Sequence, residues 1–326
     1  MDDVLEMGTK FPERLVKEVF FKANGKSALA KLSNQVPVSF VGNKEMMFTM
    51  DGEVELVGES EPKSYHVAAL TPVVMTPKKV QYGFRVSDEF LYATEAEQIE
   101  VLGNFTDGFA KKVARGLDIM SFHGFNPKTA TAAASLANIN FDALVTQTVT
   151  TTSGSEDTDI ETAIAKFDNY DIYDVNGIAM SKAYRTSLSK LTIGDSATKI
   201  KMFPELKWGA DVNSLNGLAA DINNTVSFGD SADLAILGDF DYFKWGYAKE
   251  IPMEIIRYGD PDGRGDLKRY NQVFIRAEAF IGWAIMDANA FVRIVESDSA
   301  HAAKVAATKA RLEAEAKASK AKKEGK

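Results

Sequence analysis

The sequence contains no cysteine and only three histidines among its 326 residues. Without a thiol, the chain can form no disulfide, thiolate zinc site, cysteine nucleophile or iron–sulfur cluster. The histidines are His66, His123 and His301, and they are too scattered in the sequence to predict one shared metal site. These absences exclude large classes of enzyme chemistry.

The sequence also lacks an excess of positive charge and any long apolar run. Its 38 Lys and Arg residues face 46 Asp and Glu residues, which gives a formal net charge of -8. Proteins that neutralise many phosphates need the opposite balance. No apolar run approaches the roughly 20 residues that span a bilayer, and the acidic start Met1-Asp2-Asp3 is unlike a secretory signal. We therefore expect a cytoplasmic site of synthesis and no membrane partner.

The sequence has the composition of a folded protein, with 45% hydrophobic and 26% charged residues. At roughly 100–200 residues per domain, its length allows two or three packed units. Near the N-terminus, apolar residues that include Phe20 recur at helical spacing and predict an amphipathic helix from Phe11 to Gly25. This helix could pack on its own domain or dock on a neighbouring subunit.

A long hairpin-like segment is predicted between about Val36 and Thr76, where short apolar pieces are broken by glycine and proline. It also carries several glutamates, among them Glu59. A two-stranded ribbon of this kind is not stable alone in water. Another part of the protein, or another subunit, is therefore expected to cover it.

The clearest predicted element is a long helix from Thr94 to about Phe122. A strand in which Val80 to Val86 alternate apolar and polar residues precedes it. Thr94 and Glu97 have the spacing of a capping box. At 1.5 Å per residue the helix would be roughly 40 Å long. Its apolar stripe consists of Ile99, Leu102, Phe105, Phe109, Val113, Leu117 and Met120.

Alternating short helices and strands predict a mixed α/β subdomain over roughly 157–250. Three later strands, 251–258, 272–285 and 291–295, are predicted to form one antiparallel set. From Asp298 onward the chain is mostly Ala, Lys and Glu, with eight bases and four acids. This tail has too few apolar residues to pack firmly and is predicted to be a solvated helix or disordered.

Two motifs suggest chemistry that their surroundings do not support. The segment from Asp260 to Asp266 is similar to the start of a calcium loop, but its glycine is misplaced and Asn271 stands where the bidentate acid belongs. We therefore predict a turn there. Acid pairs such as Glu59 with Glu61 lack any phosphate loop, dinucleotide fingerprint or nucleophile elbow around them. The residues predict no catalytic, cofactor or metal site.

Taken in order, several segments resemble the major capsid proteins of tailed phages of the Hong Kong 97 type. They match an apolar pair before a glutamate in an extended loop, a strand that enters a spine helix, an aspartate before the glycine that ends this helix, and later strand ends. The segments are Leu56-Val57-Gly58-Glu59, Pro77-Lys78, Val86-Ser87-Asp88-Glu89-Phe90-Leu91, Ala114-Arg115-Gly116-Leu117-Asp118, Phe122-His123-Gly124, Gly238-Asp239-Phe240, Val273 to Arg276, Gly282 and Ala290-Phe291.

The resemblance implies an α+β fold of the Hong Kong 97 capsid type. It implies a structural protein, not an enzyme, whose copies form an icosahedral shell around double-stranded DNA. The implied parts are an N-terminal arm at 1–35, an extended β-hairpin loop at 36–76, a peripheral domain at 77–156 with a spine helix at about 94–123, an α/β axial domain at 157–250, peripheral strands at 251–297 and a charged tail at 298–326.

The resemblance also implies which residues and partners matter. Hexamers and pentamers of the chain itself, a portal, a scaffold or maturation protease, decoration proteins and weakly held DNA are the expected partners, in a virion capsid assembled in the bacterial cytoplasm. An encapsulin-like nanocompartment and a soluble α/β enzyme or binding protein are the alternatives. The expected contacts between subunits are Phe20, Phe48, Leu56, Val57, Glu59 and Lys63, and the expected spine-helix core is Ile99, Leu102, Phe109, Val113 and Leu117.

Overall fold

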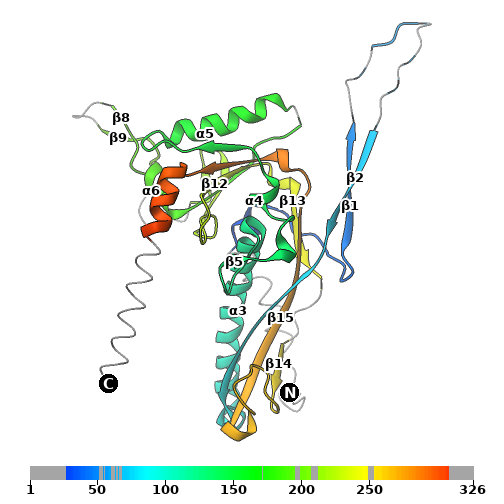
Figure 1. Ribbon diagram of the computed structural model, residues 1–326, viewed down its shortest axis with the longest axis vertical. Coiled ribbons are helices and arrows are strands. Elements are labelled where there is room, and N and C mark those ends of the chain that lie inside the picture. Colours follow the sequence, from blue (N-terminus) through cyan, green and yellow to red (C-terminus); the bar gives the residue numbers. More distant parts are fainter. Residues whose placement is uncertain are drawn as a thin grey trace. The chain divides into compact units, whose positions relative to one another are not determined.

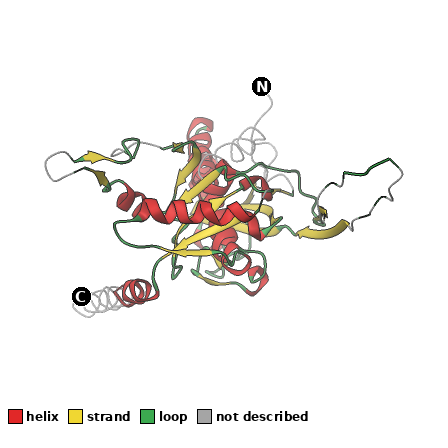
Figure 2. Ribbon diagram, turned by 90° about the horizontal axis from the view of Figure 1, so that it is seen from above, coloured by secondary structure: helices red, strands yellow, loops and turns green. Residues whose placement is uncertain are grey.

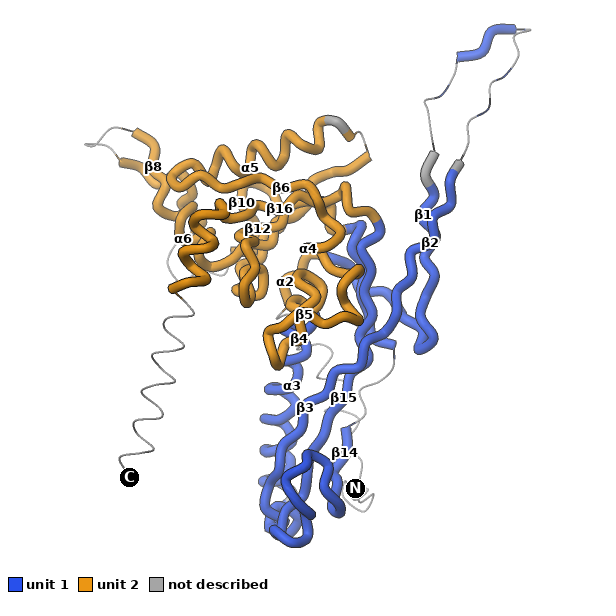
Figure 3. The backbone as a smooth tube through the Cα atoms, in the orientation of Figure 1, with its two compact units in different colours: residues 1–26, 33–117, 241–286 blue, residues 27–32, 118–240, 287–326 orange. Residues whose placement is uncertain are grey.

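The computed structural model describes residues 27–50, 54, 56–59, 63, 65, 68–170, 172–194, 199–206, 212–248 and 253–307. These residues form two compact units, each assembled from separate stretches of chain (Figure 3). Unit 1 holds 33–117 and 241–286, and unit 2 holds 27–32, 118–240 and the residues from 287 onward. The chain thus leaves unit 1 near the C-terminal end of its longest helix, after residue 117, and returns to it at residue 241.

Unit 1 is organised around one long strand, β15 (Gln272–Ile285) (Figure 1). Strands β13 (Phe243–Tyr247) and β14 (Met253–Ile256) pair with it on one side and β3 (Lys78–Ser87) on the other, all antiparallel. The alternating sequence from Val80 to Val86 lies in β3, so the predicted strand is confirmed.

The predicted long helix is confirmed as α3 (Glu95–His123), which follows the short 3-10 helix η1 (Asp88–Tyr92). Its first turn carries the predicted capping box. The backbone N–H of Thr94 donates to the Glu97 carboxylate at 2.9 Å, and the Glu97 N–H donates to the Thr94 hydroxyl at 3.5 Å. Phe105 of α3 packs against Phe84 of β3, with ring centroids 5.2 Å apart.

Strands β1 (Asn43–Met50) and β2 (Ala68–Met75) form the predicted two-stranded ribbon (Figure 1). Their antiparallel register runs from Asn43 opposite Met75 to Met50 opposite Ala68. At the base of the ribbon, Met75 packs with Val38 and Ala284 in a small buried cluster. The base is therefore anchored in unit 1, while the strands beyond it pair only with each other among the described residues.

Unit 2 contains a six-stranded mixed sheet. Its two strands with every residue buried, β7 (Gly177–Met180) and β12 (Asp233–Gly238), are neighbours near the middle of the sheet, which is typical of strands covered on both faces. Helix α5 (Glu156–Ala165) lies across the sheet (Figure 2). In spatial order the strands are β10 (Ser214–Leu215), β11 (Leu218–Ile222), β7 (Gly177–Met180), β12 (Asp233–Gly238), β16 (Phe291–Val295) and β6 (Thr148–Thr150).

The position of β16 corrects the sequence prediction. Residues 291–295 do form a strand, but the prediction that they join the antiparallel set of 251–258 and 272–285 is wrong. β16 pairs antiparallel with β12 and parallel with β6. Gly238 of β12 makes this possible, because a Cβ there would lie only 2.1 Å from the Ala290 carbonyl oxygen.

Shorter elements complete the described chain. The hydroxyl of Ser181 caps the helix that follows it, since it accepts a bond from the Tyr184 N–H at 3.2 Å. The predicted helix at Phe11–Gly25 lies outside the described residues. The remaining elements are α2 (Ala28–Leu32), β4 (Phe125–Asn126), β5 (Thr131–Ala132), η2 (Ala134–Leu136), α4 (Phe141–Leu144), η3 (Lys166–Asn169), α6 (Lys182–Leu188), β8 (Thr192–Ile193), β9 (Ile200–Lys201), η4 (Phe240–Tyr242), η5 (Lys268–Tyr270), η6 (Ala288–Ala290) and a helix over 298–307.

Candidate functional site

The ribbon formed by β1 and β2 carries large apolar side chains in contact with solvent. Phe48 is 58% exposed, and Leu56 in the loop beyond the strands is 98% exposed. Val57 is half-buried, while Glu59 and Lys63 are exposed. Phe20, the remaining predicted contact, lies outside the described residues. Exposed apolar groups gathered on one projecting element indicate a surface that binds another protein.

The face of α3 that packs inward differs from the predicted stripe at one position. Leu102, Phe109, Val113 and Leu117 are buried, but Ile99 is 43% exposed, so its assignment to the core of this chain is wrong. The neighbouring Gln98 turns inward instead, because its side-chain amide donates to the carbonyls of Leu91 and Ala93 at 3.3 and 3.0 Å. These bonds tie the first turn of the helix to the segment before it.

One functional feature of unit 2 is the buried carboxylate of Asp118, near the end of α3. It accepts bonds from the Ser27 hydroxyl at 2.5 Å and from the N–H groups of Ala28 and Leu29 at 3.0 and 3.3 Å. Asn223 and Thr225 also donate to it, at 3.3 and 2.9 Å. The carboxylate therefore caps helix α2 and joins it to two other segments.

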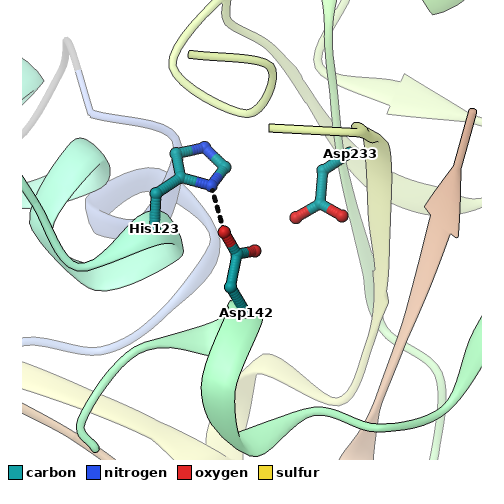
Figure 4. Close-up of side chains that lie close together, drawn as sticks. All are labelled: His123, Asp142 and Asp233. Carbon is teal, nitrogen blue, oxygen red and sulfur yellow. Dashed lines mark hydrogen bonds and ion pairs between the residues drawn. The ribbon is translucent and has the colours of Figure 1, made fainter. Parts of the chain in front are cut away.

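A second feature is a cluster of alternating charges formed by His123, Asp142, Asp233 and Arg293. Figure 4 shows the histidine and the two acids of this cluster. The His123 ring lies 2.9 Å from an Asp142 carboxylate oxygen and 2.9 Å from the Thr225 carbonyl oxygen. The carbonyl can only accept, so one ring nitrogen carries a proton. An ionised Asp142 requires a proton on the other nitrogen as well, which makes the ring a cation.

Arg293 joins the two carboxylates of this cluster. Its Nη2 lies 2.8 Å from Asp233 and 3.0 Å from Asp142, and its Nε donates to both oxygens of Asp233 at 3.0 and 3.2 Å. Its Nη1 donates to the Asp142 and Val145 carbonyls at 3.1 and 3.3 Å. The guanidinium thus uses its whole fork on two carboxylates and two backbone groups.

Burial and charge shift the pKa values of these groups. Burial raises the pKa of Asp118 to about 6 in spite of the hydrogen bonds that favour its ionised form. Burial, together with the charge of Asp142, raises the pKa of Asp233 to about 7. Burial disfavours the charged form of His123, but the hydrogen bond to Asp142, the charges of Asp142 and Asp233 and the bond to the Thr225 carbonyl together outweigh this and raise the pKa of the imidazole.

The cluster has the side chains of a metal site, with ligand atoms of His123, Asp142 and Asp233 within 4.8 Å of one another. Arg293 places a fixed positive charge against both carboxylates, where it would repel a metal cation. The guanidinium and the imidazolium balance the acids instead. The cluster is therefore suited to holding chain segments together and not to catalysis.

Both features meet at Thr225, whose hydroxyl donates to Asp118 and whose carbonyl oxygen faces His123. The end of α3 thus holds the same loop at two points. The sequence pattern predicts neither Asp118 nor the cluster around His123 as a site. A usable signal was present at Asp118, a charged residue among the apolar residues that end the helix.

The segment from Asp260 to Asp266 forms the predicted turn. The Asp260 carboxylate accepts bonds from the N–H groups of Arg264 and Gly265, both at 2.9 Å. Arg85 donates to Asp262 at 2.9 Å and to the Gly265 carbonyl oxygen at 2.7 Å. Backbone groups and an arginine therefore occupy the acids that a calcium ion would need.

The raised pKa values of Asp118, Asp233 and His123 predict how the stability of unit 2 changes with pH. Asp118 binds its proton more tightly in the folded state than in the unfolded chain, so ionising it costs stability. As the pH rises from about 5 to 7, ionisation of Asp118 alone should lower the free energy of unfolding by about 1 kcal/mol. The raised pKa values of Asp233 and His123 act in the same direction as the pH rises.

Chemical denaturation at a series of pH values measures this effect. For the variant Asp118→Asn, the free energy of unfolding should fall less steeply between about pH 5 and 7 than for wild type. The variant Asp230→Asn removes an exposed carboxylate, so its curve of free energy against pH should be parallel to that of wild type. Parallel curves for Asp118→Asn and wild type would contradict the assignment. The comparison uses slopes, so a uniform loss of stability in the variant does not affect it.

The fold, the exposed apolar ribbon and the charge-balanced cluster are features of a structural protein. A family model described as the phage capsid family matches residues 8–295. The chain therefore belongs to the phage capsid family. No curated protein sequence matches the chain.

Solved structures from phages share this fold. One from Mycobacterium phage Ogopogo is 32% identical, with a TM-score of 0.68 over 83% of this chain and 92% of its own. One from Gordonia phage Cozz is 25% identical, with a TM-score of 0.68 over 82% and 86%. The capsid of a native GTA particle is 14% identical, with a TM-score of 0.56 over 85% and 90%, and shares the fold.

The chain is thus a major capsid subunit of a tailed phage, whose copies assemble into an icosahedral shell. It is a structural protein and not an enzyme, and its place is the virion capsid. No helix among the described residues is long and apolar enough to cross a bilayer.

Proposed function

We propose that the chain forms a shell of the Hong Kong 97 type from hexamers and pentamers, with double-stranded DNA inside. The observation that carries this proposal is the row of exposed apolar side chains on the ribbon of β1 and β2. Met46, Phe48 and Leu70 are each more than half exposed. Burying such side chains contributes about 1.5–3 kcal/mol each, which is the scale of a useful subunit contact.

In this proposal the exposed part of the extended loop at 36–76, and the part of the N-terminal arm at 1–35 that precedes α2, lie across neighbouring subunits. Phe20, Phe48, Leu56, Val57, Glu59 and Lys63 supply the contacts. Of the peripheral domain expected at 77–156 and 251–297, β3, most of α3 and residues 251–286 are proposed to form that domain. The axial domain expected at 157–250 is proposed to include β6 and β16 as well, because they share its sheet, and the tail begins at 298. Each contact can be moderate, because a closed symmetric shell repeats it many times.

The proposed partners follow from charge and from the needs of a shell. The net charge of -8 favours weak, non-specific contact with DNA, since a container must not hold its contents by neutralising many phosphates. A portal, a scaffold or maturation protease and decoration proteins would act with the subunit during assembly in the host cytoplasm. Electron microscopy of purified particles, together with their nucleic-acid absorbance, tests the proposal. A subunit that stays monomeric at every salt and protein concentration would oppose it.

The role of the loop can be tested at Leu56, which is 98% exposed in the single subunit. Leu56→Asp should reduce the yield of shells several-fold or more, because a charge would be buried at every copy of the contact. Leu56→Met keeps the apolar volume and serves as the matched control, with a yield close to wild type. Sedimentation of the assembled material measures the yield. Equal yields for the Asp and Met variants would remove Leu56 from the interface.

A further inference from the structure

Two asparagine-glycine pairs lie in the part of the chain that the structure describes, Asn176-Gly177 and Asn216-Gly217. A third, Asn24-Gly25, lies outside it. In such a pair the backbone nitrogen of the glycine can attack the side-chain carbonyl carbon of the asparagine. Glycine lacks the Cβ that hinders this attack in other residues, so the local fold decides which pair reacts.

Asn216 and Gly217 form the turn between β10 and β11, where Leu215 pairs with Leu218. Their φ angles of 47° and 92° are both in the left-handed region that a two-residue hairpin turn of this type requires. Both residues are exposed, and nothing lies within 4 Å of the position that a Cβ of Gly217 would occupy. The pair is therefore open to water and free of steric obstruction.

The position of this turn also favours local opening. β10 has two residues and lies at the edge of its sheet, and among the described residues β11 is its only partner. Short edge strands at loop tips open more often than the centre of a sheet. The side chain of Asn216 can therefore reach the geometry that the attack requires without disturbing the central strands.

The pair Asn176-Gly177 has the same two residues in the opposite environment. The side-chain amide of Asn176 donates to Asp239 at 2.7 Å and accepts from the Phe240 N–H at 2.9 Å. Gly177 is buried at the start of β7, between β11 and β12. Attack at this site would require the loss of both side-chain hydrogen bonds and the opening of a central strand.

We propose that Asn216 is a site of spontaneous deamidation in the folded subunit and that Asn176 is protected. The nitrogen of Gly217 forms a bond to Cγ of Asn216, and the bond from Cγ to Nδ2 breaks. Ammonia leaves with the proton lost by the Gly217 nitrogen, and a succinimide remains. Water then opens this ring at either carbonyl and gives aspartate or isoaspartate, so water is the only co-reactant.

The modification changes the turn in two ways. Each event adds one negative charge, and the isoaspartate product also lengthens the backbone of a two-residue turn by one carbon. Leu215, next to the turn, is 3% exposed and belongs to the core of unit 2. A longer turn no longer matches the pairing of Leu215 with Leu218. Deamidation at Asn216 would therefore accumulate with time and disturb the pairing of β10 with β11 at the edge of the sheet.

The test compares native full-length protein, as subunits and as shells, with protein unfolded in urea. Both are incubated at mildly alkaline pH, digested and mapped by fragment-ion mass spectrometry for the mass gain of about one dalton. In native protein we expect Asn176 to react at least about tenfold more slowly than Asn216, because central strands open less often than edge turns. In urea the two should react at similar rates.

The variant Asn216→Gln is the matched control, because attack on the longer side chain must form a less favourable six-membered ring. It should remove most of the mass gain from this peptide without changing the rate at Asn176. Equal native rates at the two asparagines would overturn the proposal. A difference that persists unchanged in urea would also overturn it, since flanking residues and not the fold would then set the rates.

Discussion

Replacing residues 46–72 with a Gly-Asn dipeptide is expected to give folded subunits that form no shells. The design follows the register of the ribbon, in which Glu45 lies opposite Val73, so that two residues can connect them as a hairpin turn. The exposed apolar side chains of the ribbon and loop are removed, and with them the surface proposed to cover a neighbouring subunit. Without that contact at every copy, closure of a shell should fail completely.

The shortened subunit should keep its fold, because the anchor of the ribbon remains. Met75 stays packed with Val38 and Ala284, and the ion pair between Glu45 and Lys244, 3.6 Å apart, is retained. Circular dichroism and the thermal midpoint should therefore match the wild type, while sedimentation and electron microscopy show no particles. Shells of normal size from this variant would exclude the ribbon as an assembly element. Loss of the folded state would instead show that the ribbon supports its own subunit.

Helix α3 illustrates what can be predicted from local sequence. Its apolar stripe and the bond-forming pair of Thr94 and Glu97 lie within a few residues of one another, so the pattern alone identifies the element and its first turn. The strand β3 and the ribbon were predictable for the same reason. The exposure of Ile99 could not be predicted in this way, because Gln98 turns inward to bond carbonyls in the preceding segment.

Strand β16 shows the limit of such patterns. Phe291 to Val295 reads correctly as a strand, but a strand pattern does not specify its partner. The choice of β12 over the sheet of β15 depends on Gly238, which permits close approach to the chain at Ala290. This close approach joins two residues that are more than fifty positions apart in the sequence, so no local pattern predicts it.

The charge cluster was beyond sequence reasoning for a related reason. His123, Asp142, Asp233 and Arg293 come from four elements that only the tertiary fold brings together. Taken alone, each of these residues is of a type that is common on protein surfaces. The apolar neighbours of Asp233 in a buried strand were the one local indication that this acid needs a partner. The assignment to a capsid family depended on the order of many weak matches and not on any site.

Arg293→Met is expected to destabilise the subunit by about 3–5 kcal/mol, because it leaves buried acids without their cation. The Asp233 side chain has no solvent exposure, and Arg293 is its bidentate partner. Methionine retains the apolar stem of the arginine, so the loss reports on the charge and its hydrogen bonds more than on packing. For a unit of this size the loss corresponds to a fall of roughly 6–20 °C in the thermal midpoint.

Arg276→Met is the matched control for Arg293→Met, because Arg276 pairs with Glu254 and Glu278 where all three side chains are partly exposed. A pair of this kind is worth about 0–1 kcal/mol, so the control should cost far less. Adding Asp233→Asn to Arg293→Met should recover part of the stability, since one of the unpaired charges is then removed. If Arg293→Met costs no more than Arg276→Met, the cluster does not stabilise unit 2. If the double variant recovers nothing, the loss arises from packing, and the stability of unit 2 does not depend on pairing Asp142 and Asp233 with a cation.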